Sequence, residues 1–334
     1  MNTLYKKNFL KISDFNKQEI LNIIILSKKL KQQRKENTEI KYLKNKKFAL
    51  IFEKESTRTR CSFEIAALEQ GAYTSYLSPG SIHLGYKESI LDTLHFLEKI
   101  YDGIVYRGNN HNNLKKISKN SSIPIWNGLT EKHHPTQILA DLLTIIEYSK
   151  KSLFEIKLVY IGDASNNIAN SLLEMAILFS LQICFIAPKE FWPKNNKIQK
   201  YEKKYNTKNT CTENIAEGIK YADFIYTDVW ISLGEPKKNH NKKITLLKKY
   251  QINQKLLALT NNSDVKVLHC LPALHDNQTN MGKEISQKYN LKNGIEITDI
   301  VFQKNKKIIF EQSENKMHTI KALMIYTLNK KVLY

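Results

Sequence analysis

The sequence predicts an α/β protein of two domains, each a parallel β-sheet flanked by helices. Short apolar runs alternate with segments of helical periodicity through most of the 334 residues, and this alternation starts afresh near residue 149. The length also fits two domains of about 150 residues each. Because strands that alternate with helices form parallel sheets and bind ligands at their carboxyl ends, we expect an active site in the cleft between the two domains.

The first block of alternation covers the chain up to residue 148. Apolar residues recur at near-helical spacing between residues 14 and 31. A second helix is expected to open at Ser56 and to end at Gly71, a typical C-cap, and Pro135 suits the first turn of a third. The elements expected here are helices over 14–31, 56–71 and 134–148 and strands over 47–52, 103–107 and 123–126.

The second block begins after the lysine pair at 150–151. Residues 171–187 are largely apolar, but they include Glu174 and Gln182 and fall short of the ~20 apolar residues that span a membrane, so we predict a buried helix followed by a strand. The Lys- and Asn-rich segments 194–210 and 236–250 are expected to be surface excursions. The expected elements are strands over 158–161, 183–187, 224–227 and 265–269 and helices over 167–180 and 316–330.

The chain is strongly basic, with 52 basic and 32 acidic residues and a formal charge of +20. Such a charge is compatible with nucleic-acid binding, because lysine and arginine neutralise phosphates. The lysines are spread through the chain beside abundant Asn and Ile, and the sequence has no zinc-finger, RNA-recognition or basic-zipper motif. We expect a solvated basic surface, with a nucleic-acid-binding protein of weak or no catalysis as the alternative.

The cysteines and the N-terminus bear on the compartment. Cys61, Cys184, Cys211 and Cys270 have no clustered spacing, which excludes a disulfide scaffold and the common zinc-finger patterns. The first residues contain no apolar core of a secretory signal. Both features favour a cytoplasmic protein.

The segment FEKESTRTR, residues 52–60, follows a predicted strand and opens a predicted helix. Ser56, Thr57, Arg58 and Thr59 would place hydroxyls, a guanidinium and free backbone N–H groups at the positive end of that helix, which is how a phosphate can be held without a Gly-rich loop. The alternative is an ordinary N-cap with solvated arginines. The phosphate-binding pattern GxxxxGK[ST] is absent, and Gly162 lacks the companion glycines of GxGxxG.

A second cluster is HPTQ, residues 134–137, at the start of a predicted helix. His134 and Gln137 can donate hydrogen bonds to a carbonyl oxygen that gains charge. The alternative is a helix cap in which His134 only packs. Arg107 ends a predicted strand, and strand ends are where ligands bind in α/β proteins.

The second half carries Asn167 in GDASNN, Asp228 and Ser232 in DVWISLGEP, and Cys270 in HCLPALHD. An aspartate suits an ammonium group and an asparagine amide suits a carboxylate. Cys270 beside His269 raises the alternative of a cysteine-dependent hydrolase. Adjacent residues of a strand point to opposite faces, however, and no nucleophile motif surrounds the thiol, so a buried cysteine in a pocket wall is the favoured interpretation.

Several motifs together resemble a known family. The chain carries, in this order, STRTR, YRG, HPTQILADLLT, GDASNN, DVWISLGEP, HCLPALHD and ENKMHTIKALM. This order and spacing are similar to those of the ornithine carbamoyltransferases and cover about residues 5–330. STRTR and HPTQ mark the carbamoyltransferase superfamily, whereas the DVW and HCLP motifs distinguish the ornithine branch from aspartate carbamoyltransferase.

The resemblance implies transfer of a carbamoyl group from carbamoyl phosphate to the side-chain amine of L-ornithine, giving citrulline and phosphate. It implies that residues 56–59 hold the phosphate, that Arg107, His134 and Gln137 hold the carbamoyl end, and that Cys270 lies between the substrates, followed by a cis Leu271–Pro272 bond. The matching positions for carbamoyl phosphate and catalysis are Ser56, Thr57, Arg58, Thr59, His83, Arg107, His134, Gln137, Cys270, Leu271 and Lys316. Those for ornithine are Asn167, Asp228, Ser232 and Leu233.

The family also implies partners and domain bounds. We expect carbamoyl phosphate and ornithine as ligands, no metal or other cofactor, no membrane and no specific nucleic acid. His83 reaches the neighbouring subunit's site in this family, which implies a homo-oligomer, a trimer or a multiple of trimers. The expected domains are 1–148 for carbamoyl phosphate, 149–315 for ornithine, and a C-terminal helix, 316–334, that packs back on the first.

Three positions depart from the family pattern. His83 stands where some relatives have Gln, and Leu233 replaces a common Met, a change that conserves volume. Lys316 replaces the usual Arg before MHTIKA and loses the planar multi-donor fork, which bears on rate more than on identity. A carbamoyltransferase for another amine, such as putrescine, is the alternative within the same class of enzyme.

Overall fold

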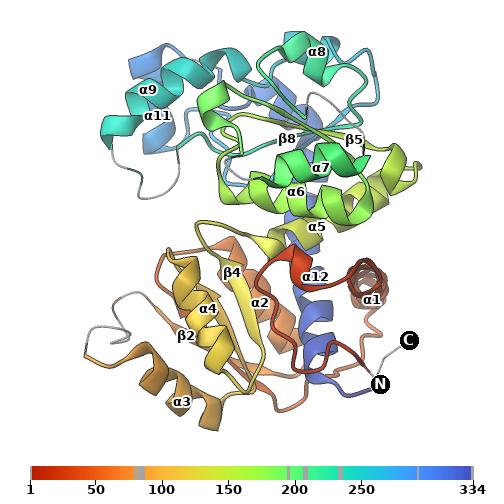
Figure 1. Ribbon diagram of the computed structural model, residues 1–334, viewed down its shortest axis with the longest axis vertical. Coiled ribbons are helices and arrows are strands. Elements are labelled where there is room, and N and C mark those ends of the chain that lie inside the picture. Colours follow the sequence, from red (N-terminus) through yellow and green to blue (C-terminus); the bar gives the residue numbers. More distant parts are fainter. Residues whose placement is uncertain are drawn as a thin grey trace. The chain divides into compact units, whose positions relative to one another are not determined.

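Two parallel β-sheets organise the computed structural model, which describes residues 2–78, 80, 87–193, 196–205, 210–231, 235, 237–291 and 293–331. The chain divides into two units: unit 1 is Met1–Leu143 with Glu314–Tyr334, and unit 2 is Thr144–Ser313. Figure 1 shows both, with strands covered by helices in each. The predicted α/β class with parallel sheets is therefore confirmed.

Unit 1 contains a four-stranded parallel sheet in the order β2-β1-β3-β4. Its strands are β1 (Lys47–Phe52), β2 (Tyr73–Leu77), β3 (Gly103–Arg107) and β4 (Ile125–Leu129). Its helices are α1 (Lys17–Glu36), α2 (Arg58–Glu69), α3 (Ile90–Ile100), α4 (His111–Asn120), most of α5 (Pro135–Tyr148) and the end of α12 (Asp299–Leu328). Because the strands are parallel, β1 and β3 deliver the STRTR segment and Arg107 to one edge of the sheet.

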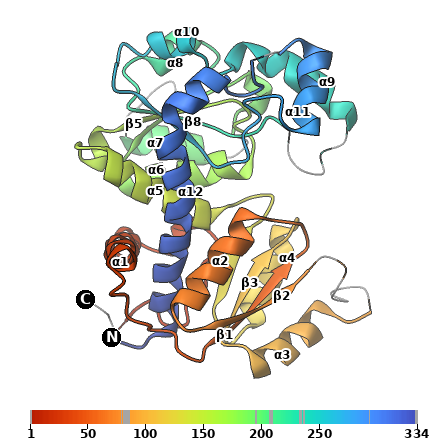
Figure 2. The ribbon, with the colours of Figure 1, turned by 180° about the vertical axis from the view of Figure 1, so that it is seen from behind.

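The inner strands β1 and β3 are buried on both faces and are mostly apolar, whereas the edge strand β2 is only partly buried. Leu94 and Leu97 of α3 and Leu114 of α4 pack with Ala49 and Ile104 on one face. Helix α2 lies across the other face (Figure 2). Helix α12 is fastened near its end by the indole Nε1 of Trp126, which donates to Thr327 Oγ1 at 3.1 Å.

Unit 2 contains a five-stranded parallel sheet in the order β7-β6-β5-β8-β9. The strands are β5 (Lys157–Ile161), β6 (Gln182–Ile186), β7 (Cys211–Thr212), β8 (Phe224–Thr227) and β9 (Lys266–His269). The helices are α6 (Asn167–Phe179), α7 (Lys197–Tyr205), α8 (Ile215–Ile219), α9 (Lys237–Leu247), α10 (Gln254–Ala258), α11 (Asn280–Tyr289) and the first part of α12. The side chains of Asn305 and Gln312 accept hydrogen bonds from Val267 N and His269 N, so α12 satisfies the edge of β9.

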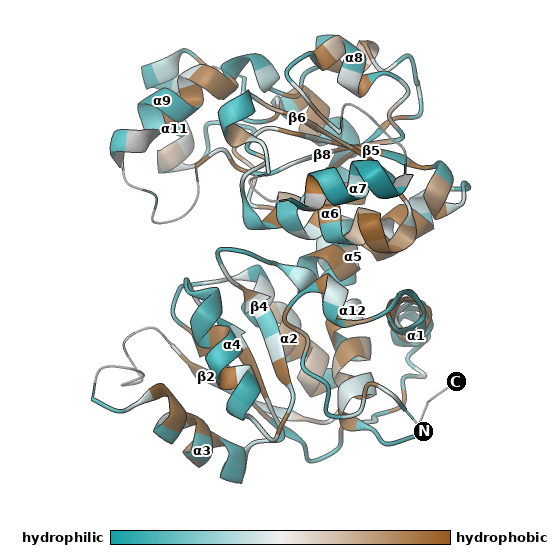
Figure 3. Ribbon diagram, in the orientation of Figure 1, coloured by the Kyte–Doolittle hydropathy of each residue, from teal (hydrophilic) through white to brown (hydrophobic). Residues whose placement is uncertain are grey.

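The structure corrects several expected elements. The last helix begins at Asp299 rather than at 316, and the two expected surface excursions contain α7 and α9. Helix α7 is mostly hydrophilic, as Figure 3 shows, which hides it from a search for apolar periodicity. Strand β4 lies at 125–129 instead of 123–126. The apolar stretch after residue 170 forms α6 and β6 as predicted, and no described helix is long and apolar enough to cross a membrane.

A buried ion cluster fastens α12 to the rest of unit 1. The Lys321 side chain is fully buried, and its Nζ lies 2.6 Å from both Glu39 Oε1 and Glu69 Oε2. Arg34 Nε lies 2.7 Å from the other oxygen of Glu69. His318, also fully buried, sits one turn before Lys321. Its pKa is lowered to about 3, because burial disfavours the imidazolium and nearby cations, Lys321 first among them, repel it.

This pKa predicts a loss of stability in mild acid. The native state keeps His318 neutral, whereas an unfolded histidine binds a proton near pH 6.5, so the stabilisation is present above pH 6.5 and is lost below it. His318→Gln removes this proton uptake. Urea unfolding at pH 7.5 and 5.5 should show that the original protein loses about 1.4 kcal/mol more than the variant over this interval. Equal losses would contradict the burial of a neutral His318.

Candidate functional site

The STRTR segment, residues 56–60, is separated from the end of β1 by three residues and leads into α2, with Thr57 as the N-cap and Arg58 as the first helical residue. The Thr57 side chain makes no capping hydrogen bond, so the alternative of an ordinary threonine N-cap is not realised at that residue. Ser56 and Arg58 are half-buried, and Thr59 is buried. The segment therefore presents hydroxyls and a guanidinium at a helix N-terminus, where backbone N–H groups attract anions.

Three elements of unit 1, α2, α12 and β3, meet at the Thr59 hydroxyl, and His134 adjoins them through Lys316. Lys316 Nζ, from α12, donates to Thr59 Oγ1 at 2.8 Å, and Arg107 Nη1, from the end of β3, approaches the same oxygen at 3.4 Å. His134, which directly precedes α5, has its Nε2 3.2 Å from Lys316 Nζ. The structure thus brings together four residues that the sequence predicted from separate motifs.

Burial and like charge set the protonation of this cluster. The pKa of Arg107 falls to about 10, because burial disfavours its charge and Arg58 adds repulsion. The Arg107 Nε is buried and has no hydrogen-bond partner among the described residues. The pKa of His134 lies well below 6.5, because of burial, Lys316 and Arg107. Since an ammonium only donates, His134 Nε2 accepts from Lys316 and the ring proton is on Nδ1.

Of the other residues predicted to bind carbamoyl phosphate, Gln137 is not joined to the Thr59 cluster and His83 lies outside the described residues. Gln137 is buried one turn into α5, and its Nε2 donates to Asp141 Oδ1 at 2.9 Å in the same helix. That bond fixes the side chain but does not join it to the Thr59 cluster. His83, Ser232 and Leu233 lie outside the described residues.

In unit 2 the carboxyl ends of β8 and β9 bring two predicted residues together. The Cys270 thiol donates to Asp228 Oδ1 at 3.0 Å, and Val229 N donates to the same oxygen at 2.8 Å. Asn166 Nδ2 approaches Asp228 Oδ2 at 3.3 Å. Burial raises the pKa of Asp228, although His269, Cys270 and the Val229 N–H act in the opposite direction. A cation in contact with this carboxylate would offset the cost of its burial.

His269 does not activate the thiol. Its Nδ1 accepts from Leu271 N at 2.9 Å, and its Nε2 lies 3.2 Å from Glu296 Oε1. Both His269 and Glu296 are fully buried, and Glu296 Oε1 also accepts from Leu274 N. The imidazole thus shapes the loop after β9, in which the Leu271–Pro272 bond is cis. These contacts disfavour the cysteine-dependent hydrolase considered from the sequence.

Sequence reasoning selected Asn167 but missed its neighbour Asn166. Asn167 is the first residue of α6, whereas Asn166 is its N-cap and accepts from Ala169 N at 2.9 Å. The Asn166 amide nitrogen also donates to Tyr160 Oη at 2.9 Å. The preference for asparagine at N-caps could have identified this residue, but its contact with Asp228 depends on the sheet order.

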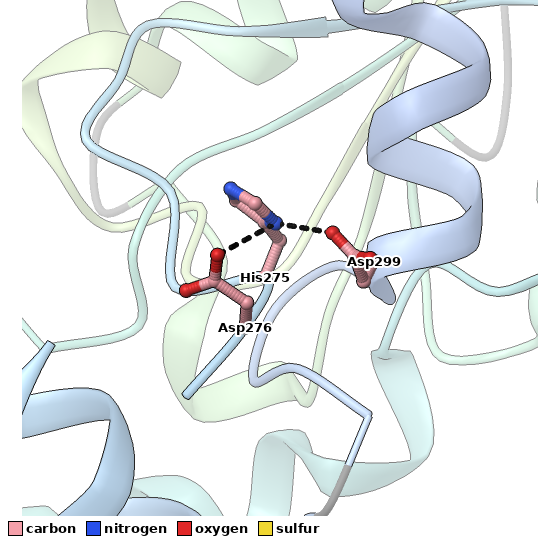
Figure 4. Close-up of side chains that lie close together, drawn as sticks. All are labelled: His275, Asp276 and Asp299. Carbon is pink, nitrogen blue, oxygen red and sulfur yellow. Dashed lines mark hydrogen bonds and ion pairs between the residues drawn. The ribbon is translucent and has the colours of Figure 1, made fainter. Parts of the chain in front are cut away.

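Within the described residues, one group has the composition of a metal site: His275, Asp276 and Asp299 (Figure 4). His275 Nδ1 is 2.7 Å from Asp299 Oδ1 and 3.8 Å from Asp276 Oδ2. Two ligands of a tetrahedral zinc ion at about 2.0–2.1 Å would be roughly 3.3 Å apart, so the 2.7 Å contact is a direct hydrogen bond. The ring also stacks on Phe302 at 3.7 Å. We assign this group to anchoring the loop at the start of α12.

Comparison with known proteins addresses the family. The family model described as aspartate/ornithine carbamoyltransferase, carbamoyl-P binding domain, matches residues 7–147. The model described as aspartate/ornithine carbamoyltransferase, Asp/Orn binding domain, matches residues 154–327. An ornithine carbamoyltransferase from Buchnera aphidicola subsp. Baizongia pistaciae is 58% identical over 338 residues, with 100% of both chains covered. One from Blochmanniella floridana is 50% identical, covering 98% of this chain and 96% of that protein.

Solved structures agree with these matches. Ornithine carbamoyltransferase from Pyrococcus furiosus is 30% identical with a TM-score of 0.84, covering 97% of this chain and 98% of its own. The anabolic ornithine carbamoyltransferase from Campylobacter jejuni is 31% identical with a TM-score of 0.81, covering 95% and 97%. The sequence is similar to ornithine carbamoyltransferases over its full length, and both family models and the fold agree. The chain therefore belongs to the aspartate/ornithine carbamoyltransferase family.

Proposed function

We propose that this protein transfers the carbamoyl group of carbamoyl phosphate to the side-chain amine of L-ornithine in the cytoplasm, releasing L-citrulline and phosphate. The observation that carries the proposal is the convergence of Arg107, Lys316 and His134 around the Thr59 hydroxyl at the N-terminus of α2. A buried group of cationic donors fits a doubly charged phosphate next to an acyl oxygen.

Unit 1 supplies electrostatic stabilisation of the transition state. As the amine attacks the carbonyl carbon, negative charge grows on the carbonyl oxygen and on the departing phosphate. We assign the phosphate to Ser56, Thr57, Arg58 and Thr59, and the carbonyl oxygen to donors from Arg107, His134, Gln137 and Lys316. Loss of one such donor typically raises the barrier by ~3–4 kcal/mol. Because the pKa of His134 is low, it acts as a neutral Nδ1–H donor and not as an imidazolium.

Unit 2 supplies the amino-acid contacts. We assign the α-ammonium of ornithine to the Asp228 carboxylate, whose burial favours a cationic partner. Asn167, Ser232 and the backbone of Leu233 complete the contacts with the amino-acid end. Cys270 donates to Asp228, and the resemblance to the family assigns Cys270 and Leu271 to the space between the two substrates. Holding two reactants in line can remove a further ~7–11 kcal/mol from the barrier.

The substrate assignment is tested with a panel of amines. Purified protein is incubated with carbamoyl phosphate and, in separate reactions, L-ornithine, putrescine, L-lysine or L-aspartate, and the carbamoylated product is quantified. We expect L-ornithine to give the largest kcat/KM. Putrescine lacks the α-ammonium and α-carboxylate that would use Asp228 and Asn167, L-aspartate has no side-chain amine to be carbamoylated, and L-lysine carries its side-chain amine one methylene further out. A larger kcat/KM with putrescine or aspartate would contradict the assignment.

The lysine at position 316 leads us to expect that its replacement by arginine raises kcat. Lys316→Arg should raise kcat with ornithine about tenfold, the effect of ~1.4 kcal/mol of added transition-state stabilisation, because arginine brings five donors in a planar fork where lysine has three. Lys316→Ala should lower kcat well below that of the original protein, while KM for ornithine changes little in either variant. Steady-state kinetics with ornithine varied at saturating carbamoyl phosphate measures both constants. Equal kcat for Lys, Arg and Ala would place residue 316 outside the site.

We also propose that the protein is a homo-oligomer, a trimer or a multiple of trimers. Ile65 and Leu68, one turn apart on α2, are 39% and 65% exposed, and Tyr73 at the start of the edge strand β2 is 64% exposed. A group of large apolar side chains beside an unpaired strand edge is typical of a protein interface. His83 follows this strand in the chain and belongs, by resemblance to the family, to a site shared between subunits.

The apolar group gives a prediction for assembly. Leu68→Glu should shift the protein from oligomer to monomer in sedimentation velocity experiments, because it places a charge in the buried interface. Phe154→Glu is the matched control, since Phe154 is 61% exposed on unit 2 and lies outside the proposed interface. An original protein that sediments as a monomer, or an oligomer unaffected by Leu68→Glu, would contradict the proposal.

A further inference from the structure

Lys243 of α9 is a buried cation that joins two loops of unit 2. Its side chain is only 10% exposed, and its Nζ lies 2.7 Å from Asp163 Oδ2 and 3.0 Å from Glu235 Oε2. Burial alone would lower the pKa of Lys243, but the carboxylates of Asp163 and Glu235 outweigh it and raise the pKa. One ammonium thus neutralises two acidic side chains, each of which belongs to a segment next to a proposed ornithine contact.

Asp163 belongs to the loop between β5 and α6. Its Oδ1 accepts from Ser165 N at 3.0 Å and Ser165 Oγ at 2.6 Å, and its backbone oxygen accepts from Tyr160 Oη at 3.1 Å. The same tyrosine oxygen accepts from Asn166, whose amide also approaches Asp228. The contact with Lys243 therefore lies at the start of a chain of hydrogen bonds that ends at the Asp228 carboxylate.

Glu235 follows Ser232 and Leu233 in the chain by three and two residues. It is held to α9 twice: its carboxylate contacts Lys243, and its backbone oxygen lies 3.1 Å from His240 Nε2. On the other side of this segment, Trp230 and Ile231 are buried. Glu235 itself is therefore fixed to α9 by both its side chain and its backbone.

We propose that Lys243 is a positioning residue for ornithine: by binding Asp163 and Glu235 at once, it fixes the loop that precedes Asn167 and the chain at Glu235 relative to each other. Lys243 itself touches no substrate. The inference rests on the proposed assignment of ornithine to Asn167, Asp228, Ser232 and Leu233. Without the ammonium, two carboxylates would face each other in a buried position, and the repulsion would separate the loops.

The test compares KM values for the two substrates. In Lys243→Met the KM for ornithine should rise about tenfold, whereas the KM for carbamoyl phosphate and kcat should each stay within about threefold, because the loss falls on binding of one substrate. Lys243→Arg keeps the charge and should bring the KM for ornithine back to within about threefold of the original. Lys242→Met is the matched control on the same helix: Lys242 is 72% exposed and pairs with Glu190, and its loss should leave all constants unchanged.

Folding and the underlying assignment are controlled separately. Thermal melting checks the fold, and Glu235→Gln, which leaves the Lys243–Asp163 pair intact, replaces Lys243→Met if that variant does not fold; the same selective rise is expected. An unchanged KM for ornithine in the folded variant, or an equal rise of both KM values, overturns the role of Lys243. If Asn167→Ala also leaves the KM for ornithine unchanged, the ornithine assignment itself is wrong, and this outcome separates the two failures.

Discussion

Burial of positive charge around the Thr59 hydroxyl is the constraint on which the candidate site depends. Arg107 and Lys316 reach this oxygen from β3 and α12, and Arg58 repels Arg107 strongly enough to contribute to its lowered pKa. Such an arrangement is unfavourable in an empty site, because both desolvation and like charge oppose it. The negative charge of a bound phosphate would offset both costs. The parallel sheet makes the arrangement possible, since β1 and β3 end at the same edge of the sheet. The ion pairs of Lys321 with Glu39 and Glu69 hold α12 in place in unit 1.

Unit 2 holds a buried negative charge, the Asp228 carboxylate. Asp228 is held at the end of a parallel strand, its oxygens receive hydrogen bonds from Cys270, Val229 and Asn166, and burial still raises its pKa. A carboxylate in this state favours an ammonium partner. In the proposed function, unit 1 binds an anion at a helix N-terminus and unit 2 binds a cationic amino group at a buried carboxylate.

The sequence predicted the elements and site residues that a local pattern of residues determines. Strands 47–52, 103–107 and 224–227 appear with those bounds, because each is a short apolar run buried on both faces. The motifs at strand ends led to Thr59, Arg107, Asp228 and Cys270. The residues that the sequence did not predict owe their positions to contacts with residues distant in the chain. The first half of α12 carries three lysines between two short apolar runs, and Asn305 and Gln312 are buried there because they satisfy β9. No local pattern distinguishes such residues, or Asn166 and Lys243, from solvated ones.

The positions at which this chain has arginine show what lysine at position 316 lacks. Of 52 basic residues only four are arginine: Arg34, Arg58, Arg60 and Arg107. Arg34 bonds Glu69, Arg60 bonds Glu64 and covers the Tyr76 ring at 3.6 Å, and Arg107 reaches Thr59, so arginine stands where a planar fork has defined partners. Lys316 already directs two of its three donors at Thr59 and His134. An arginine could keep both contacts and still donate to the carbonyl oxygen. In the proposed function, lysine in place of arginine at 316 therefore keeps the positive charge beside the carbonyl oxygen but supplies fewer donors to it, which bears on the rate of carbamoyl transfer.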